Sequence, residues 1–127
     1  MPADRPALAT ARTAVVWLLP ILILLQAVLA GQHLFEGEDV IKIHGYIGNA
    51  TFALAVIGVP LTFLLRKGDG VAFGIAVALA AGTFAQVGLG YVGRESTAAA
   101  AWHIPLGVAL IALSGVQLGS TRPAPRA

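Results

Sequence analysis

Residues 13–35 read TAVVWLLPILILLQAVLAGQHLF, a run with no Asp, Glu, Lys or Arg. About 20 apolar residues in a helix are enough to cross the hydrocarbon core of a bilayer. The rest of the chain is similar, because 57% of its 127 residues are hydrophobic, only 11% are charged, and the mean hydropathy is +0.84. A soluble domain carries about 25% charged residues. The composition therefore predicts a membrane protein with a single domain.

Three more apolar stretches follow the first, and all four must be helical because lipid offers the backbone no hydrogen-bond partners. Their short connections favour antiparallel neighbours. We therefore predict an all-α, integral membrane, up-down-up-down four-helix bundle. Residues 1–12 would form a cytoplasmic N-terminal segment, 13–119 the transmembrane domain and 120–127 a cytoplasmic tail. The expected spans cover about 13–35, 40–65, 71–92 and 98–118, with Pro20, Pro60 and Pro105 inside them.

Basic residues predict the orientation, since they concentrate on the cytoplasmic side of membrane proteins. One side would hold six of them and the other only two: Arg5, Arg12, Arg66, Lys67, Arg122 and Arg126 against Lys42 and Arg94. Both termini are thus expected in the cytoplasm of a bacterial cell, with the chain in the plasma membrane. The outward side would then carry the acidic loop and most interfacial aromatics, namely Glu36, Glu38 and Asp39 with Tyr46, Tyr91 and Trp102, whereas Trp17 would lie toward the inner side.

The first stretch also has features of a cleaved secretory signal. Arg5 and Arg12 would form its basic region, and cleavage would follow residues 28–30, Val-Leu-Ala. The apolar run is long for a signal, however. Cleavage would also leave an odd number of spans and break an internal repeat.

That repeat relates the first two spans to the last two. The second span opens with HGYIG at 44–48 and the fourth with HIPLG at 103–107, an offset of 59. The preceding spans match as well, with QAVLAG at 26–31 against QVGLG at 86–90, an offset of 60. Nearly equal offsets for two motifs predict two repeated hairpins, related by a pseudo-twofold axis along the membrane normal.

The repeat singles out His44 and His103, which would lie at the same depth in the outer leaflet on diagonally opposed helices. Two imidazoles facing each other across a bundle can supply both axial ligands of a haem iron. Gly48 and Gly107 lie four residues after the histidines, on the same helix faces. Their missing side chains would leave room for a flat macrocycle. The competing interpretation is a pair of structural or interfacial histidines.

His33 has no counterpart in the third span and is interpreted as a solvated residue at a helix end. It could instead complete a three-histidine zinc or copper site with His44 and His103. Gln26 and Gln86 are expected to form hydrogen bonds between helices. No Asp, Glu, Lys or Arg lies deep in any span, which argues against a proton pump or an ion-coupled transporter. The absence of cysteine excludes covalent c-type haem.

The pattern of Gln26 and Gly31, His44 and Gly48, Gln86, and His103-Ile104-Pro105 with Gly107 resembles small bacterial four-helix membrane proteins of the cytochrome-b-like kind. This resemblance implies non-covalent haem b held by His44 and His103. Haem A synthase also has four-helix halves with histidine pairs, but this chain lacks the membrane-embedded Glu of that enzyme.

The function expected from these observations is electron transfer by a b-type cytochrome or haem-binding subunit, rather than catalysis by a stand-alone enzyme. Its partners would be membrane lipid and a redox protein or a quinone, either in a homodimer or in a larger membrane complex. The basic residues form no stripe that would bind nucleic acid. The alternatives from other classes are a cofactor-free membrane scaffold and an outer-face metal-binding protein.

Overall fold

The computed structural model describes residues 5–36, 39–65 and 69–120, and almost all of this part of the chain is helical. It forms four helices: α1 (Arg5–Glu36), α2 (Ile41–Leu65), α3 (Gly70–Val92) and α4 (Thr97–Ser120). By length and composition, each is long and apolar enough to cross a membrane. The prediction of an all-helical chain with four membrane-length helices is confirmed.

Helix α1 begins eight residues before the expected span, at Arg5 instead of residue 13. Pro6 is compatible with this start because the first turn of a helix leaves its backbone N–H groups unpaired in any case. The hydroxyls of Thr10 and Thr13 donate to the carbonyls of Pro6 and Ala9, at 3.0 and 2.9 Å. The described part of the expected N-terminal segment is therefore a helical extension of the first span.

Polar caps mark the starts of the two later helices. The side chain of Asp69 accepts a 3.0 Å hydrogen bond from the backbone N–H of Ala72, where α3 begins. The Ser96 hydroxyl accepts one from Ala99 N–H at 3.4 Å, where α4 begins. Such caps satisfy N–H groups that the helix leaves unpaired. They set the start of each helix.

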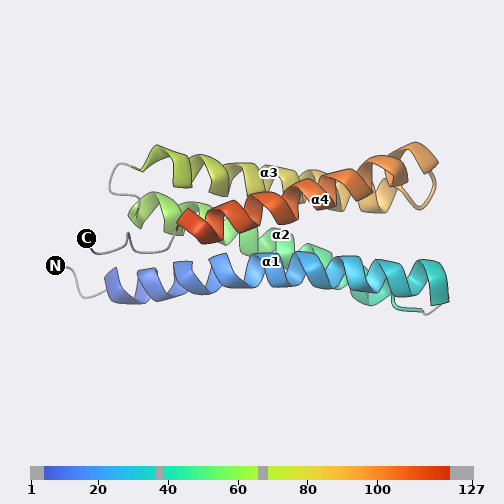
Figure 1. The fold of residues 1–127 in the computed structure, drawn as a ribbon, viewed down its shortest axis with the longest axis horizontal. Helices are drawn as coiled ribbons and strands as arrows, with labels where there is room; N and C mark the ends of the chain where they lie inside the picture. The colour runs from blue at the N-terminus through green and yellow to red at the C-terminus, as the bar shows by residue number, and fades with distance from the viewer. Residues whose placement is uncertain (1–4, 37–38, 66–68, 121–127) are drawn as a thin grey trace.

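The helices pack in a ring in which α1 contacts α2 and α4, while α3 contacts α2 and α4. Helices α2 and α4 are thus diagonal partners, as expected. Figure 1 shows that α1 begins at the end of the bundle where α4 finishes. The end of α1, the start of α2 and the α3–α4 turn lie together at the opposite end.

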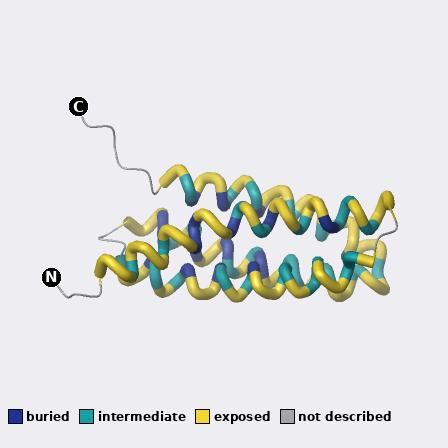
Figure 2. Tube along the Cα trace, turned by 90° about the horizontal axis from the view of Figure 1, so that it is seen from below, coloured by how far each residue is buried: buried dark blue, intermediate teal, exposed yellow. Residues whose placement is uncertain are grey.

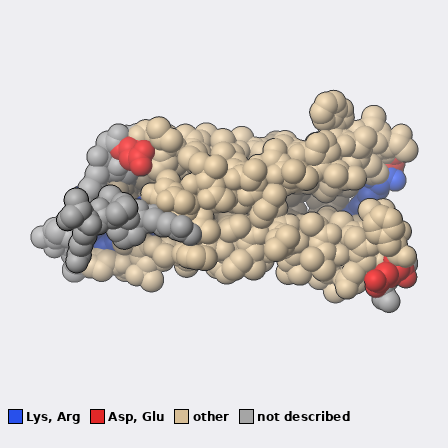
Figure 3. Space-filling model, in the orientation of Figure 1, with Lys and Arg blue, Asp and Glu red and all other residues tan. Residues whose placement is uncertain are grey.

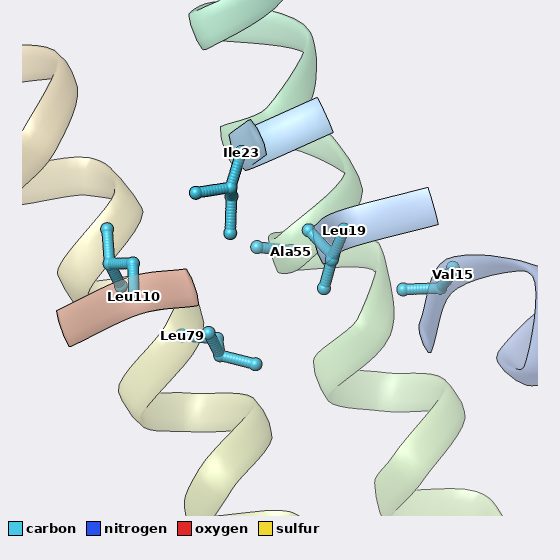
Figure 4. Close-up of a cluster of buried hydrophobic side chains, with 6 residues drawn as sticks. All are labelled: Val15, Leu19, Ile23, Ala55, Leu79 and Leu110. Atoms are coloured by element: carbon cyan, nitrogen blue, oxygen red, sulfur yellow. The ribbon is translucent and has the colours of Figure 1, made fainter. Parts of the chain in front are cut away.

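A narrow apolar core runs between the helices, and Figure 2 shows that the buried positions face inward. Its six buried side chains, drawn in Figure 4, are Val15, Leu19, Ile23, Ala55, Leu79 and Leu110. Glycines allow close approach at two points. A Cβ on Gly58 would lie 3.1 Å from Val15, and one on Gly82 would lie 2.6 Å from Leu110. These two glycines are therefore packing positions between helices.

The outer surface of the bundle is largely apolar. Ile21, Leu24 and Val108 are each more than half exposed. On the face shown in Figure 3, the charged side chains lie at the two ends and the middle carries none. A soluble monomer rarely exposes so much continuous apolar surface. The surface is of the kind that lipid-facing helices require.

The residues used to predict orientation are only partly described. Arg5 and Arg12 belong to the start of α1, whereas Lys42 and Arg94 belong to the opposite end of the bundle. The aromatic side chains expected at the interfaces, Tyr46, Tyr91, Trp102 and Trp17, are exposed. The remaining charges used in that argument, Arg66, Lys67, Arg122, Arg126 and Glu38, lie outside the described residues.

Candidate functional site

The structure brings His44 and His103 together, although 59 positions separate them in the sequence. His44 lies in the first turn of α2 and His103 in the second turn of α4. Their ring centroids are 6.1 Å apart and the ring planes are tilted by 52°. Both residues are partly buried. The two helices do not pack directly against each other, so these side chains reach across the diagonal of the bundle.

Each imidazole is held by the helix that precedes its own. His44 Nδ1 lies 3.2 Å from the carbonyl oxygen of Gln26, and His103 Nδ1 lies 3.0 Å from that of Gln86. A carbonyl oxygen can only accept a hydrogen bond, so Nδ1 carries the proton in both bonds. In the neutral ring, Nε2 then keeps its lone pair. Metal-ligating histidines are commonly oriented by a bond of this type from the other ring nitrogen.

The two glycines that follow the histidines lie against the same two glutamines. A Cβ on Gly48 would be 3.3 Å from Oε1 of Gln26, and one on Gly107 would be 3.2 Å from Nε2 of Gln86. Each hairpin therefore contains one unit, in which a glutamine of the first helix contacts both the histidine and the glycine of the second. We call it the Gln-His-Gly unit.

This contact changes the interpretation of the glycines. The sequence suggested that Gly48 and Gly107 leave space for a flat group, but a glutamine side chain occupies the space beside each of them. The physical reason is the close approach of the two helices within each hairpin, which brings the amide onto the glycine. Their structural role in this packing is to admit the glutamine.

The two units differ in the hydrogen bonds made by the side-chain amide of the glutamine. Gln86 Nε2 donates a 2.9 Å hydrogen bond to the carbonyl oxygen of His103, which fulfils the prediction of a bond between helices. Among the described residues, Gln26 Nε2 finds no hydrogen-bond partner although it is buried, and neither does Gln86 Oε1. Buried amide groups without partners are costly in lipid. Two unpaired polar atoms therefore belong to the glutamines that hold the histidine pair.

The third histidine does not extend the pair into a larger metal site. His33 is partly buried near the end of α1. Within residues 5–36, 39–65 and 69–120, no three His, Cys, Asp or Glu side chains come close enough together to hold a metal ion. The three-histidine zinc or copper site thus gains no support from the geometry.

The spacing of the histidine pair can be tested against what a shared iron requires. A bond from an imidazole nitrogen to a metal is about 2.0 Å long, and the ring centroid lies about 1 Å behind that nitrogen, so two opposed ligands place their centroids about 6 Å apart. The observed separation is 6.1 Å. The donor atoms and the centroid separation are therefore compatible with two imidazoles bound to one metal ion.

Two contributors to this site were not identified from the sequence. A Cβ on Gly90 would lie 3.1 Å from Cε1 of His103. The missing side chain therefore leaves room for the imidazole ring. The backbone carbonyls of Gln26 and Gln86 orient the rings, which no side-chain motif could reveal. The repeat aligns the two glutamines and places Gly90 one helical turn after Gln86, but it does not show which atoms contact the histidines.

Comparison with protein-family models, with curated proteins and with solved structures finds no match to this chain. The candidate site therefore depends on the contacts of its own residues.

Proposed function

We propose that this chain is a membrane b-type cytochrome, or a haem-binding subunit, that carries electrons. The observation that supports it best is the pair of histidines 6.1 Å apart, each with Nδ1 bonded to a backbone carbonyl. In this proposal His44 and His103 hold the iron of non-covalent haem b. The bound haem would supply reversible one-electron oxidation and reduction.

The protein residues have a defined part in this function. The carbonyls of Gln26 and Gln86 orient the imidazoles and increase the basicity of Nε2. With both histidines bound to the iron, no position would remain open for oxygen, which favours electron transfer over oxygen chemistry. Among the described residues, Nε2 of Gln26 and Oε1 of Gln86 are buried and unpaired, so only a group that enters the bundle would reach them.

The proposal places the chain in the bacterial plasma membrane as an up-down-up-down bundle with both termini in the cytoplasm. Four membrane-length helices and an apolar outer surface support insertion. Reporter fusions at Met1 and Ala127 should both give cytoplasmic signals. A terminus found outside would reverse the orientation, but His44 and His103 would still share one leaflet.

A spectrum of the purified protein tests the cofactor. Protein made in haem-replete cells should show a sharp Soret band and split visible bands after reduction. Pyridine extraction should release all the haem, because the sequence has no cysteine to bind it covalently. A colourless, folded preparation would contradict the proposal.

One observation favours a second candidate, a cofactor-free membrane scaffold. The glutamines fill the space beside Gly48 and Gly107, so each hairpin packs closely without any ligand. Tilted aromatic rings with centroids 4.5–7 Å apart also form ordinary packing contacts. In a scaffold, the histidines would serve only packing and their hydrogen bonds to the Gln26 and Gln86 carbonyls. His44→Phe and His103→Phe should then lower stability by no more than those two bonds contribute and leave assembly unchanged.

A further inference from the structure

A second site lies outside the histidine pair, at the end of the bundle that contains the start of α2 and the α3–α4 turn. It is a cavity of about 280 Å³, lined by Lys42, Gly45, Tyr46, Tyr91 and Arg94. In Figure 3, Lys and Arg atoms are visible in the hollow at that end. The cavity combines two cations with two exposed tyrosines.

Several contacts hold the arginine at this cavity. The guanidinium of Arg94 lies over the ring of Tyr91, 5.0 Å from its centroid. The Tyr91 hydroxyl accepts a 2.9 Å hydrogen bond from Asn49 Nδ2, which fixes the ring against α2. Gly45 has no side chain to fill the space beside Arg94, where a Cβ would lie 3.8 Å from the guanidinium. The arginine is therefore placed by α2 and α3 together.

Neither cation of the cavity is paired within the described structure, although the carboxylates of Glu36, Asp39 and Glu95 lie at the same end of the bundle. No Asp or Glu of residues 5–36, 39–65 and 69–120 forms an ion pair with Lys42 or Arg94. Two cations in one cavity repel each other and attract an anion. These are also the two basic residues on the side of the predicted membrane topology that is otherwise poor in positive charge.

The surface next to the cavity suggests what kind of anion fits. One turn before Tyr91, Gly88 is exposed and a Cβ there would meet nothing within 4 Å. One turn further, Phe84 is 66% exposed and its ring lies 5.7 Å from that of Phe52 across the α2–α3 contact. The cationic cavity is thus continuous with an open apolar strip between α2 and α3 that contains Gly88, Phe84 and Phe52. We call this strip the seam. A free anion would use the cavity alone, whereas an amphiphile would use both.

We propose that this seam between α2 and α3 binds an anionic phospholipid, with its phosphate between Lys42 and Arg94 and an acyl chain running over Gly88 to Phe84. Basic pockets between membrane helices bind anionic lipid head groups on the cytoplasmic side, and the same attraction between charges acts in a basic cavity at the other interface. A zwitterionic lipid fits less well, because its own cation would face the two basic side chains. The inference uses the proposed membrane insertion but not the proposed haem.

Native mass spectrometry of the detergent-purified full chain tests this site, with phosphatidylglycerol and phosphatidylcholine offered in equal amounts. The wild type should retain phosphatidylglycerol at least about tenfold better, given the attraction of each basic residue to anionic lipid. The Lys42→Ala/Arg94→Ala variant should lose this preference. The matched control Arg5→Ala, which removes a cation from the opposite end, should keep it. Equal retention of both lipids by the wild type would overturn the proposal.

Two more variants separate charge and shape from general damage. The exchange Lys42→Arg/Arg94→Lys keeps both cations and should keep the preference, so its loss there would contradict the charge argument. Gly88→Leu fills the apolar seam and should weaken retention several-fold without changing the cations. Unchanged retention in Gly88→Leu would show that no acyl chain lies on the seam.

The same samples distinguish other sources of the anion. Inorganic phosphate at millimolar concentration should not displace the lipid, and displacement would assign the cavity to a free anion instead. Haem content, read from the absorbance, should be equal in wild type and in Lys42→Ala/Arg94→Ala. If that variant loses haem but keeps its lipid preference, the cations serve the haem and the lipid proposal is wrong.

Discussion

The α1–α2 and α3–α4 hairpins contain the same Gln-His-Gly unit but do not satisfy it equally. In both, the imidazole donates to the backbone carbonyl of a glutamine, at 3.2 Å in the first hairpin and 3.0 Å in the second. Only the second adds a bond from the glutamine amide to the histidine carbonyl. Only the second has a glycine, Gly90, against the imidazole, and the repeat aligns it with Ala30. The second hairpin therefore holds its histidine more firmly than the first.

This difference teaches how two halves of one site can be repeated without being equivalent. In both hairpins, the imidazole Nδ1 donates to a glutamine carbonyl, which leaves Nε2 of His44 and of His103 with a free lone pair. The features that differ affect how rigidly each ring is held. Under the proposed function, removing a shared feature should affect both hairpins alike, and removing an unshared feature should affect only one.

The largest effect is expected from the histidines themselves. Under the proposed function, each of His44→Ala and His103→Ala would remove a ligand of the iron and should lower haem affinity by more than about 100-fold, since even the loss of a partner that only orients a ligand costs about 10–100-fold. Haem content and spin state, read from optical spectra, measure this loss. His33→Ala is the control and should keep a low-spin spectrum. A variant of either paired histidine that retains full low-spin haem would remove that residue from the site.

The next largest effect is expected from the glycines. In Gly48→Leu and Gly107→Leu the new side chain must displace Gln26 or Gln86, whose amides lie 3.3 and 3.2 Å from the Cβ positions. Because the backbone carbonyl of each glutamine orients a histidine, a shift of that helix to make room for leucine should disturb the ring, and we expect a loss of haem affinity of about tenfold in both. Gly115→Leu is the matched control in α4, since a Cβ there meets nothing within 4 Å. If both test variants bind haem as the control does, the Gln-His-Gly unit does not support the ligands.

A smaller, one-sided effect is expected from the glutamine amides. Gln86→Leu removes the 2.9 Å bond to the His103 carbonyl and should destabilise the protein by about 1 kcal/mol, a usual value for hydrogen bonds between membrane helices. Gln26→Leu removes an amide whose Nε2 has no partner and should cost less. Unfolding of both variants in mixed micelles measures the difference. Equal costs would contradict the asymmetry between the hairpins.

The smallest effect is expected from the glycine beneath the second imidazole. Gly90→Ala places a Cβ 3.1 Å from Cε1 of His103, so the ring must shift by a few tenths of an ångström. We expect haem to remain bound with a small change in its reduction midpoint. Ala30→Gly at the aligned position is the comparison and should change the midpoint less. A midpoint unchanged by Gly90→Ala would show that the ring has room to move.

Much of the architecture could be predicted from the sequence, because lipid imposes a simple requirement on it. The ends of α2, α3 and α4 lie within two residues of the expected spans, whereas α1 begins eight residues before the first expected span. There the alanine-rich segment continues the helix past the point where apolarity ends. Hydropathy measures whether a residue favours lipid or water. It therefore does not show where a helix ends in water.

The site could be predicted only in part. The repeat identified His44 and His103, because a duplicated motif carries more information than a single polar residue. It did not show that Gln26 and Gln86 contact both the histidine and the glycine, since that depends on the rotation of each helix about its axis. The cationic cavity was also missed. Lys42 and Arg94 are 52 positions apart, and in the sequence they contribute only to a charge count.

The claim that each hairpin supplies one ligand to a single iron is tested most directly by titrating haem into the purified apoprotein. Low-spin absorbance should rise and saturate at one haem per chain. In the double variant His44→Ala/His103→Ala it should not rise at all. Saturation at two haems per chain, or the same low-spin signal from the double variant, would contradict a shared iron between the two hairpins.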